Sequence, residues 1–281
     1  MLPIPRLSHN LKIVRKDGET YDFADHGILV QSFIVDSPSP VHNRITNDGR
    51  DGFIDGGTTY DGRTLHATCM LWATDIPDFA LFRDELFRAL DSRDSFYLIN
   101  DAEPGKRWNV KVDSKFSLMQ KSIVGSFTID FESDKPYAES VGRTDIDPID
   151  MDSDMWQMVG GGIPLDDDPV YLQSTNSFKI WNGGDIAIDP RLHELIVDFV
   201  GASSGLTIKN LTTGEQFQYT GATSSSDKLE LNKMTAYKSG ANVLGDTSRT
   251  FISLAPGWND IQLSGTSGVF KIIFGFRFLY L

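Results

Sequence analysis

The segment Thr64-Leu65-His66-Ala67-Thr68-Cys69-Met70-Leu71-Trp72 opens the stretch, ending at Tyr137, that decides the fold. Every second residue from Leu65 to Leu71 is apolar, which is the period of a strand with one buried face. Cys69, the only cysteine, lies on that face, so we expect a buried hydrophobe rather than a reactive thiol. A single cysteine also excludes an intrachain disulfide and a cysteine-rich zinc site.

An amphipathic helix is predicted for residues 79–90. Asp75 offers an N-cap oxygen before it, and Pro77 falls in the first turn, where its missing N–H is harmless. The apolar residues of one helical stripe are Phe79, Phe82, Leu86 and Leu90. We therefore expect one helix that plugs or flanks a curled antiparallel sheet.

The other strands of this unit lie on both sides of the helix. Three are predicted after it, at residues 95–100, 107–112 and 123–131. Before it, Asp17-Gly18 predicts a hairpin and residues 27–35 predict a strand. Residues 42–61 are rich in Gly, Asp, Asn and Arg, and predict a long polar loop with one short strand at Phe53-Ile54. Loops of this length are usually functional or are ordered by a partner.

Composition places the chain among β-rich globular proteins. It has 281 residues, of which 40% are apolar and 23% charged, with 25 glycines and 18 phenylalanines. The first residues show no signal-peptide features, and no apolar run approaches the ~20 residues that span a bilayer. The net charge is −13. Since no basic stripe is present, we expect no sequence-specific or tight nucleic-acid binding. The lack of a long apolar run predicts that the chain has no membrane segment.

Three regions are predicted, at residues 1–138, 139–170 and 171–281. The middle region is an acidic linker: residues 139–168 hold nine acids and one base, a net charge of −8. It contains a Gly160-Gly161-Gly162 break and a short structured patch at residues 155–158. The last region shows many short strands with intervening turns, which is typical of a β-sandwich. The predicted fold class is mainly β, with an N-terminal β-barrel-like or β-sandwich domain that carries one helix.

The hydrolase signal in the sequence is weak. Residues 201–205 match G-x-S-x-G around Ser203, but a nucleophile elbow needs a helix after the serine. Residues 206–211 have the period of a strand instead, and His193, the last histidine, precedes the motif. A hairpin turn is predicted there.

The metal signals are also weak. Residues 150–154 begin like an EF-hand loop, yet Met155 and Gly161 stand at positions that require Gly and Glu. A solvated acidic linker is the preferred interpretation. The aspartates Asp48, Asp51, Asp55 and Asp61 suit turns at least as well as a metal loop, and His42 and His66 are not assigned as ligands. We predict no catalytic, cofactor-binding or metal-binding residue, and no cofactor.

With both halves laid out, the chain resembles the distal tail proteins (Dit family) of siphophages that infect Gram-positive bacteria. The motifs that carry the resemblance are residues 61–65, 79–86, 95–99, 104–110, 127–131 and 136–137 in the first half, and 177–184, 208–214 and 255–259 in the second. The order and spacing of these motifs are more telling than any single one.

The resemblance implies a non-enzymatic homohexameric ring at the virion tail tip, with a lumen for DNA passage and a galectin-like C-terminal β-sandwich. The implied partners are the major tail tube protein, the tape measure protein, a tail-associated tip or lysin protein, and receptor-binding or baseplate proteins. Two alternatives stay open. One is a carbohydrate- or receptor-binding module that uses Trp181, Tyr219 and Trp258; the other, less favoured, is a cell-wall hydrolase that uses Ser203.

Overall fold

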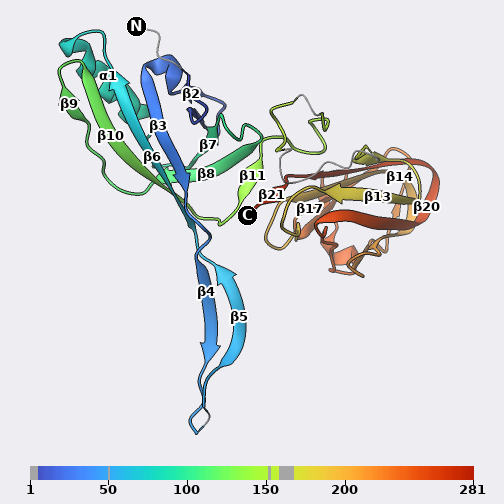
Figure 1. Cartoon of the computed structure of the whole chain (residues 1–281). Helices are drawn as coiled ribbons and strands as arrows, with labels where there is room; N and C mark the ends of the chain where they lie inside the picture. The colour runs from blue at the N-terminus through green and yellow to red at the C-terminus, as the bar shows by residue number, and fades with distance from the viewer. Residues whose placement is uncertain (1–5, 50, 151–152, 158–167) are drawn as a thin grey trace. The chain divides into compact units, whose positions relative to one another are not determined.

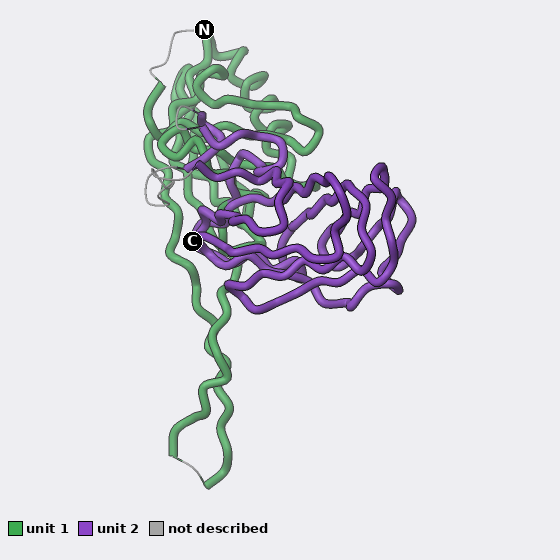
Figure 2. Tube along the Cα trace, turned by 90° about the vertical axis from the view of Figure 1, so that its right-hand side faces the viewer, with its two compact units in different colours: residues 1–138, 281 green, residues 139–280 purple. Residues whose placement is uncertain are grey.

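Figure 1 shows the computed structural model, which describes residues 6–49, 51–150, 153–157 and 168–281. The chain divides into two compact units (Figure 2): residues 1–138 with Leu281, and residues 139–280. Each unit is described by itself below. The three predicted regions remain a prediction, but the described residues of the predicted linker, 139–150, 153–157 and 168–170, belong to the second unit.

The N-terminal unit is built on an antiparallel sheet. Its strands are β1 (Leu11–Val14), β2 (Thr20–Asp22), β3 (Ile28–Val35), β6 (Arg63–Trp72), β7 (Phe96–Asn100), β8 (Lys106–Val112), β9 (Met119–Lys121) and β10 (Val124–Ser133). Their order is β2-β1-β7-β8-β10-β6-β3, and β9 pairs with β10. The predicted hairpin at Asp17-Gly18 and the strands predicted on both sides of the helix are confirmed.

Strand β6 lies between β10 and the edge strand β3 of this sheet. Its residues alternate between buried and half-buried along its whole length, and Cys69 is buried as expected. It pairs with β10 from Arg63↔Ser133 to Trp72↔Val124 and with β3 on its other side. The period of two that the sequence shows therefore corresponds to one core-facing side of the sheet.

The predicted helix is α1 (Ile76–Ala89), which starts three residues before Phe79. The start is set by Asp75, whose side chain accepts a hydrogen bond of 2.8 Å from the Asp78 amide. The helix buries Phe79 and Leu86, and Gly125 of β10 leaves room for the Phe79 ring, which a Cβ there would meet at 2.7 Å. No helix in the described part of the chain is long and apolar enough to cross a bilayer.

The prediction of a long polar loop at residues 42–61 is wrong. The segment is a hairpin of β4 (Pro40–Ile45) and β5 (Ile54–Tyr60), joined from Pro40↔Tyr60 to Ile45↔Ile54. Both strands are exposed on both faces, so no apolar/polar alternation marks them in the sequence. We call residues 40–60 the arm.

The C-terminal unit is also antiparallel. Its strands are β12 (Leu172–Gln173), β13 (Ser177–Asn182), β14 (Leu195–Asn210), β15 (Gln216–Gln218), β16 (Ala222–Thr223), β17 (Lys228–Asn232), β18 (Thr235–Lys238), β19 (Ala241–Asn242), β20 (Gly257–Phe276) and β21 (Leu279–Tyr280). Strand β11 (Ala138–Ser140), which pairs with β21, begins at the last residue of the first unit before Leu281 and ends in the second unit. The main order is β12-β20-β14-β17-β18-β19; β13 pairs with β20, and β15 and β16 pair with β14.

The prediction of a hairpin turn at residues 201–205 is likewise wrong, because strand β14 continues through these residues. The pairing of β14 with β20 shifts register at Gly201/Ala202 and at Ser203/Thr207. These bulges bend the strand without ending it. Gly265 of β20 takes a φ of 80°, and a Cβ there would meet the Gly205 carbonyl oxygen at 2.6 Å. The glycines that suggest a turn therefore serve a close approach of two backbones.

Buried asparagines hold the turns of this unit. The Asn259 side chain accepts from the Ala255 amide at 2.9 Å and from Asn210 Nδ2 at 3.0 Å, and donates to the Ala255 carbonyl at 2.8 Å. Asn182 Nδ2 donates to the carbonyls of Ile186 (2.9 Å) and Leu254 (3.2 Å). All three asparagines are buried, so the motifs at residues 177–184, 208–214 and 255–259 encode turn geometry.

The described part of the acidic region packs on this unit. Trp156 is buried with its ring centroid 5.0 Å from that of Phe278, and its Nε1 donates to the Pro148 carbonyl at 3.0 Å. Thr144 and Ser140 bond to the backbone of residues 274–278. The predicted Gly160-Gly161-Gly162 break lies outside the described residues, as do Met151 and Asp152 of the EF-hand-like stretch at residues 150–154.

Candidate assembly surfaces

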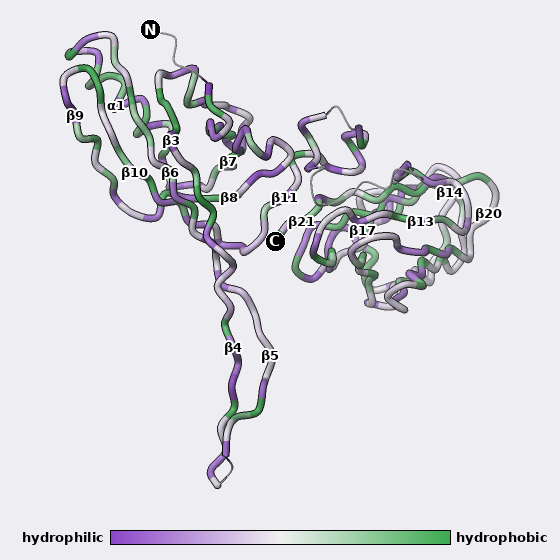
Figure 3. Tube along the Cα trace, in the orientation of Figure 1, coloured by the Kyte–Doolittle hydropathy of each residue, from purple (hydrophilic) through white to green (hydrophobic). Residues whose placement is uncertain are grey.

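The arm exposes apolar side chains. Its large apolar residues are between 37% and 54% exposed: Val41, Ile45, Phe53, Ile54 and Tyr60. In Figure 3 several hydrophobic stretches lie along both strands of the arm. A two-stranded hairpin is marginally stable in water on its own, and its free edges can pair with another chain. The arm therefore combines exposed apolar side chains with two strands that are exposed on both faces.

The shape of the arm is fixed by its own sequence. Gly56 stands opposite Asn43, where a Cβ would meet the Asn43 carbonyl oxygen at 2.9 Å, and the register shifts between His42 and Arg44. Near the tip, the Arg44 guanidinium lies 4.5 Å from the Phe53 ring centroid. These contacts keep apolar and cationic groups together at the end of the arm.

The root of the arm is tied to the sheet by Arg63. Its Nε donates to the Asp36 carbonyl at 2.6 Å, and its Nη1 donates to the Pro136 carbonyl at 3.1 Å. The guanidinium also lies 5.1 Å from the Trp108 ring centroid. Burial lowers the pKa of Arg63. One buried cation thus joins the strand before the arm, the strand after it and the end of the unit.

The outward face of β3, β6 and β10 is mixed: His66, Thr68 and Asp130 share it with Ile34, which is 56% exposed, and with Met70 and Trp72. His66 lies between two carboxylates: its Nδ1 is 2.7 Å from Asp130 Oδ1, and its Nε2 is 3.2 Å from Asp36 Oδ2. The hydrogen bonds that Asp130 and then Asp36 accept from the imidazole raise the pKa of His66. These three strands contain one basic residue, Arg63, which is buried, so they expose no Lys or Arg on this face. Lys111 of β8, which stands opposite Glu132, borders the face.

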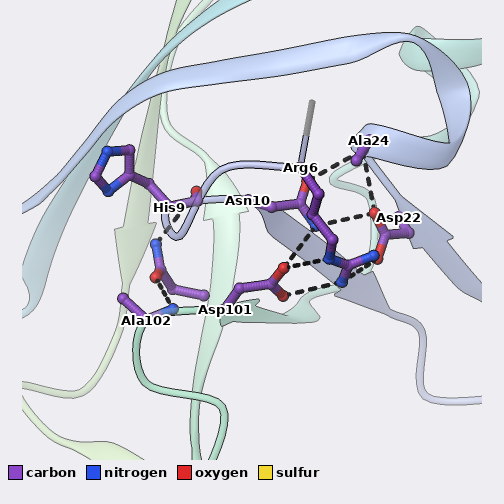
Figure 4. Close-up of polar contacts among 8 residues, drawn as sticks. Arg6, His9, Asn10, Asp22, Ala24, Asp101 and Ala102 are labelled. Atoms are coloured by element: carbon purple, nitrogen blue, oxygen red, sulfur yellow. Dashed lines mark hydrogen bonds and ion pairs between the residues drawn. The ribbon is translucent and has the colours of Figure 1, made fainter. Parts of the chain in front are cut away.

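A polar cluster fixes the segment before β1 (Figure 4). Arg6 donates to Asp101 Oδ2 at 2.6 Å and to Asp22 Oδ2 at 2.9 Å. Asn10 Nδ2 bonds to the same two carboxylates, and its Oδ1 accepts from the Ala24 amide at 3.0 Å. The cluster joins β2 to the turn between β7 and β8.

The end of α1 is held by Arg15. Its guanidinium donates to the carbonyls of Asp91 (2.6 Å), Ala89 (2.7 Å) and Arg88 (3.1 Å). A cation on these carbonyls pairs them and complements the negative end of the helix. It fixes α1 against the β1–β2 hairpin.

The residues considered for chemistry are not brought together. Ser203 is 4% exposed, and its hydroxyl bonds to Thr223 Oγ1 at 2.7 Å. Trp181 and Tyr219 are buried in the core, so they offer no sugar platform with the half-buried Trp258. His42 bonds to Thr58 Oγ1 at 2.8 Å within the arm. In residues 6–49, 51–150, 153–157 and 168–281, no group of three or more His, Cys, Asp or Glu is placed to hold a metal ion.

Comparison with known proteins identifies the first unit. Residues 16–133 match the family model of the phage tail protein RIFT-related domain. The matched residues make up most of the N-terminal unit and less than half of the chain. The RIFT-related domain spans the strands from β2 to β10, the helix and the arm.

The whole chain, RIFT-related domain included, is similar in fold to the Dit protein (gp 19.1) of phage SPP1. The TM-score is 0.67 at 11% identity, over 95% of this chain and 99% of that chain. That protein is described as a paradigm of the hub adsorption apparatus in phages that infect Gram-positive bacteria. The predicted fold class and the resemblance to the distal tail proteins are confirmed by the domain match and this fold.

Two chains of the activated phage P2 baseplate are also similar, one with Ca and one with Sr. Their TM-scores are 0.48 and 0.46 at identities of 10% and 11%. The matches cover 97% and 94% of this chain and 98% and 97% of those chains. No curated protein sequence matches the chain.

Proposed function

We propose that this protein is a structural distal tail protein, a non-enzymatic hub that joins the tail tube to the tail-tip or baseplate apparatus. The observation that carries the proposal is the fold likeness to a phage hub protein over nearly the full length of both chains, together with the phage tail domain at residues 16–133. The proposed place of action is the virion tail tip, and the proposed assembly is a homohexameric ring.

The arm supports assembly from several copies. Covering a large apolar side chain contributes about 1.5–3 kcal/mol when it is fully exposed beforehand. The five apolar residues of the arm are about half exposed, so each would contribute about 1 kcal/mol and together about 5 kcal/mol per interface. That amounts to more than a thousandfold in an association constant.

The outward face of β3, β6 and β10 supports a channel-lining role, because these three strands expose no Lys or Arg on it. Such a wall does not attract phosphate as lysine- and arginine-rich surfaces do. DNA would therefore pass it without sticking. The proposed partners at the two ends of the ring are the tail tube protein with the tape measure protein, and the tip, lysin or receptor-binding proteins.

The test is the mass of the purified full-length protein, by mass photometry and by multi-angle light scattering, with and without tail partners. A sixfold particle is expected. A variant with Val41, Ile45, Phe53 and Ile54 changed to Ser should remain folded by circular dichroism and lose the ring. Leu192→Ser with Val269→Ser is the matched control, since these residues are 74% and 89% exposed outside the arm. A protein that stays monomeric at high concentration, alone and with its partners, would refute the proposal.

A further inference from the structure

A cleft in the C-terminal unit is formed by four turns that lie far apart in the sequence. It has a volume of about 650 Å³ and is lined by residues 189–191, 214–216, 234 and 248–251. This size is within the range of small-molecule sites. The hub role proposed above does not use it.

Arg249 supplies a free cation at this cleft. Its backbone is left-handed, with a φ of 56°, and its amide bonds to Thr247 Oγ1 at 3.2 Å. In the part of the chain that the structure describes, no residue bonds to its guanidinium. Arg191, by contrast, is held by Asp189 through contacts of 2.6–3.0 Å. A guanidinium fork without a partner suits a carboxylate or phosphate.

Glu215 supplies a fixed acceptor. Its Oε2 accepts from the Ser253 amide at 2.7 Å and from the Ser253 hydroxyl at 2.5 Å. Within the described residues, Oε1 has no bond, so it can accept from a ligand hydroxyl. Ser253 is itself held, because its carbonyl accepts from Asn210 Nδ2 at 2.7 Å. The acceptor is therefore oriented before any ligand arrives.

The apolar part of the cleft is an aromatic ring and a thioether. Phe251 is half-buried, with its ring centroid 5.7 Å from that of the buried Phe217, which fixes one side of the ring. Met234 is 41% exposed. Aromatic and thioether surfaces contact the C–H face of a sugar ring, while donors and acceptors at the edge meet its hydroxyls.

We propose that this cleft binds an acidic saccharide, with Arg249 on the acidic group, Glu215 on a hydroxyl and Phe251 against the ring. An acidic peptide fits less well, because Glu215 would repel a chain of carboxylates, whereas a sugar ring brings hydroxyls to Glu215. The sequence gives no sign of the cleft, since its residues come from turns between strands.

Titration of the full-length protein with glucuronic acid, glucose 1-phosphate and glucose, followed by NMR or calorimetry, tests the proposal. The two acidic sugars distinguish a carboxylate from a phosphate preference. At least one should bind about tenfold more tightly than glucose, because it adds a charge-assisted hydrogen bond. Arg249→Asn should remove that preference; asparagine tolerates the left-handed backbone, so the turn is kept.

Two further variants control the result. Lys179→Gln removes an exposed cation elsewhere in the same unit and should leave binding unchanged. Met234→Trp fills the cleft and should weaken all three sugars, while ring assembly stays as in the wild type. The proposal is overturned if no acidic sugar binds at tens of millimolar (roughly −2 to −3 kcal/mol), if Arg249→Asn binds like the wild type, or if an acidic peptide binds and the sugars do not.

Discussion

Replacing Arg63 with methionine should loosen the root of the arm without unfolding the sheet. The change removes two hydrogen bonds from a charged group, each contributing about 1.5–3 kcal/mol, and a cation–π contact of about 1–2 kcal/mol. The change also removes an unfavourable contribution, because burying the guanidinium in the wild type costs several kcal/mol of desolvation. The net loss in the free energy of unfolding should be about 2–4 kcal/mol.

The loss arises largely from what is left behind. The carbonyls of Asp36 and Pro136 lose their donors at 2.6 and 3.1 Å, and methionine can pack on Trp108 but cannot pair them. Arg63→Lys should be nearly as destabilising, since an ammonium lacks the fork that reaches both carbonyls.

Urea unfolding measures the stability, and hydrogen exchange measures the root of the arm. We expect faster exchange at the Asp61 amide, which bonds to the Ser39 carbonyl at 3.0 Å, and unchanged exchange in β1 and β7. Arg93→Met is the control, because the Arg93 side chain is 88% exposed and pairs with Asp91 two residues before it. A stability change below about 0.5 kcal/mol, the range of ordinary surface substitutions, with unchanged exchange in Arg63→Met would refute this reasoning.

Three other predictions follow from the same contacts. Arg15→Ala should lower the free energy of unfolding by about 1–3 kcal/mol, since the last carbonyls of α1 lose their partner; an unchanged urea midpoint would contradict this. Asn259→Ala should cost about 2–4 kcal/mol and broaden NMR signals of residues 253–257, because the Ala255 amide and one N–H of the Asn210 side chain lose their acceptor; sharp, unshifted signals would argue against it. The pKa of His66 is raised above the ordinary 6.5. The contacts of the protonated His66 therefore contribute fully to the free energy of unfolding below about pH 6.5, and this contribution is lost as the pH rises through the folded pKa. The stability difference between the wild type and His66→Gln should thus shrink from pH 6 to pH 9, which are about 0.5 below and 2.5 above the ordinary pKa of histidine. A difference that stays constant would count against the His66 contacts.

The sequence predicts well where burial on one face imposes a pattern. The alternation of β6 and the cap at Asp75 are both local, and both are found in the structure. The arm is missed because neither face of β4 or β5 is buried, so their composition has no period. Strands β14 and β20 are each predicted as several short strands. The reason is that Gly205 and Gly265 allow two backbones to approach, and the sequence does not distinguish such glycines from glycines in turns. The cleft at Arg249 depends on four turns that only the folded chain brings together.

The long pairing of β14 with β20 has a mechanical consequence. The two strands, of 16 and 20 residues, run antiparallel from Leu195↔Phe276 to Asn210↔Ile261. A pull along the direction of these strands loads their ladder hydrogen bonds in shear, so that many must break at once, whereas a pull across them opens the pairs one after another. The C-terminal unit should therefore resist extension along β14 and β20 far more than extension at right angles to them.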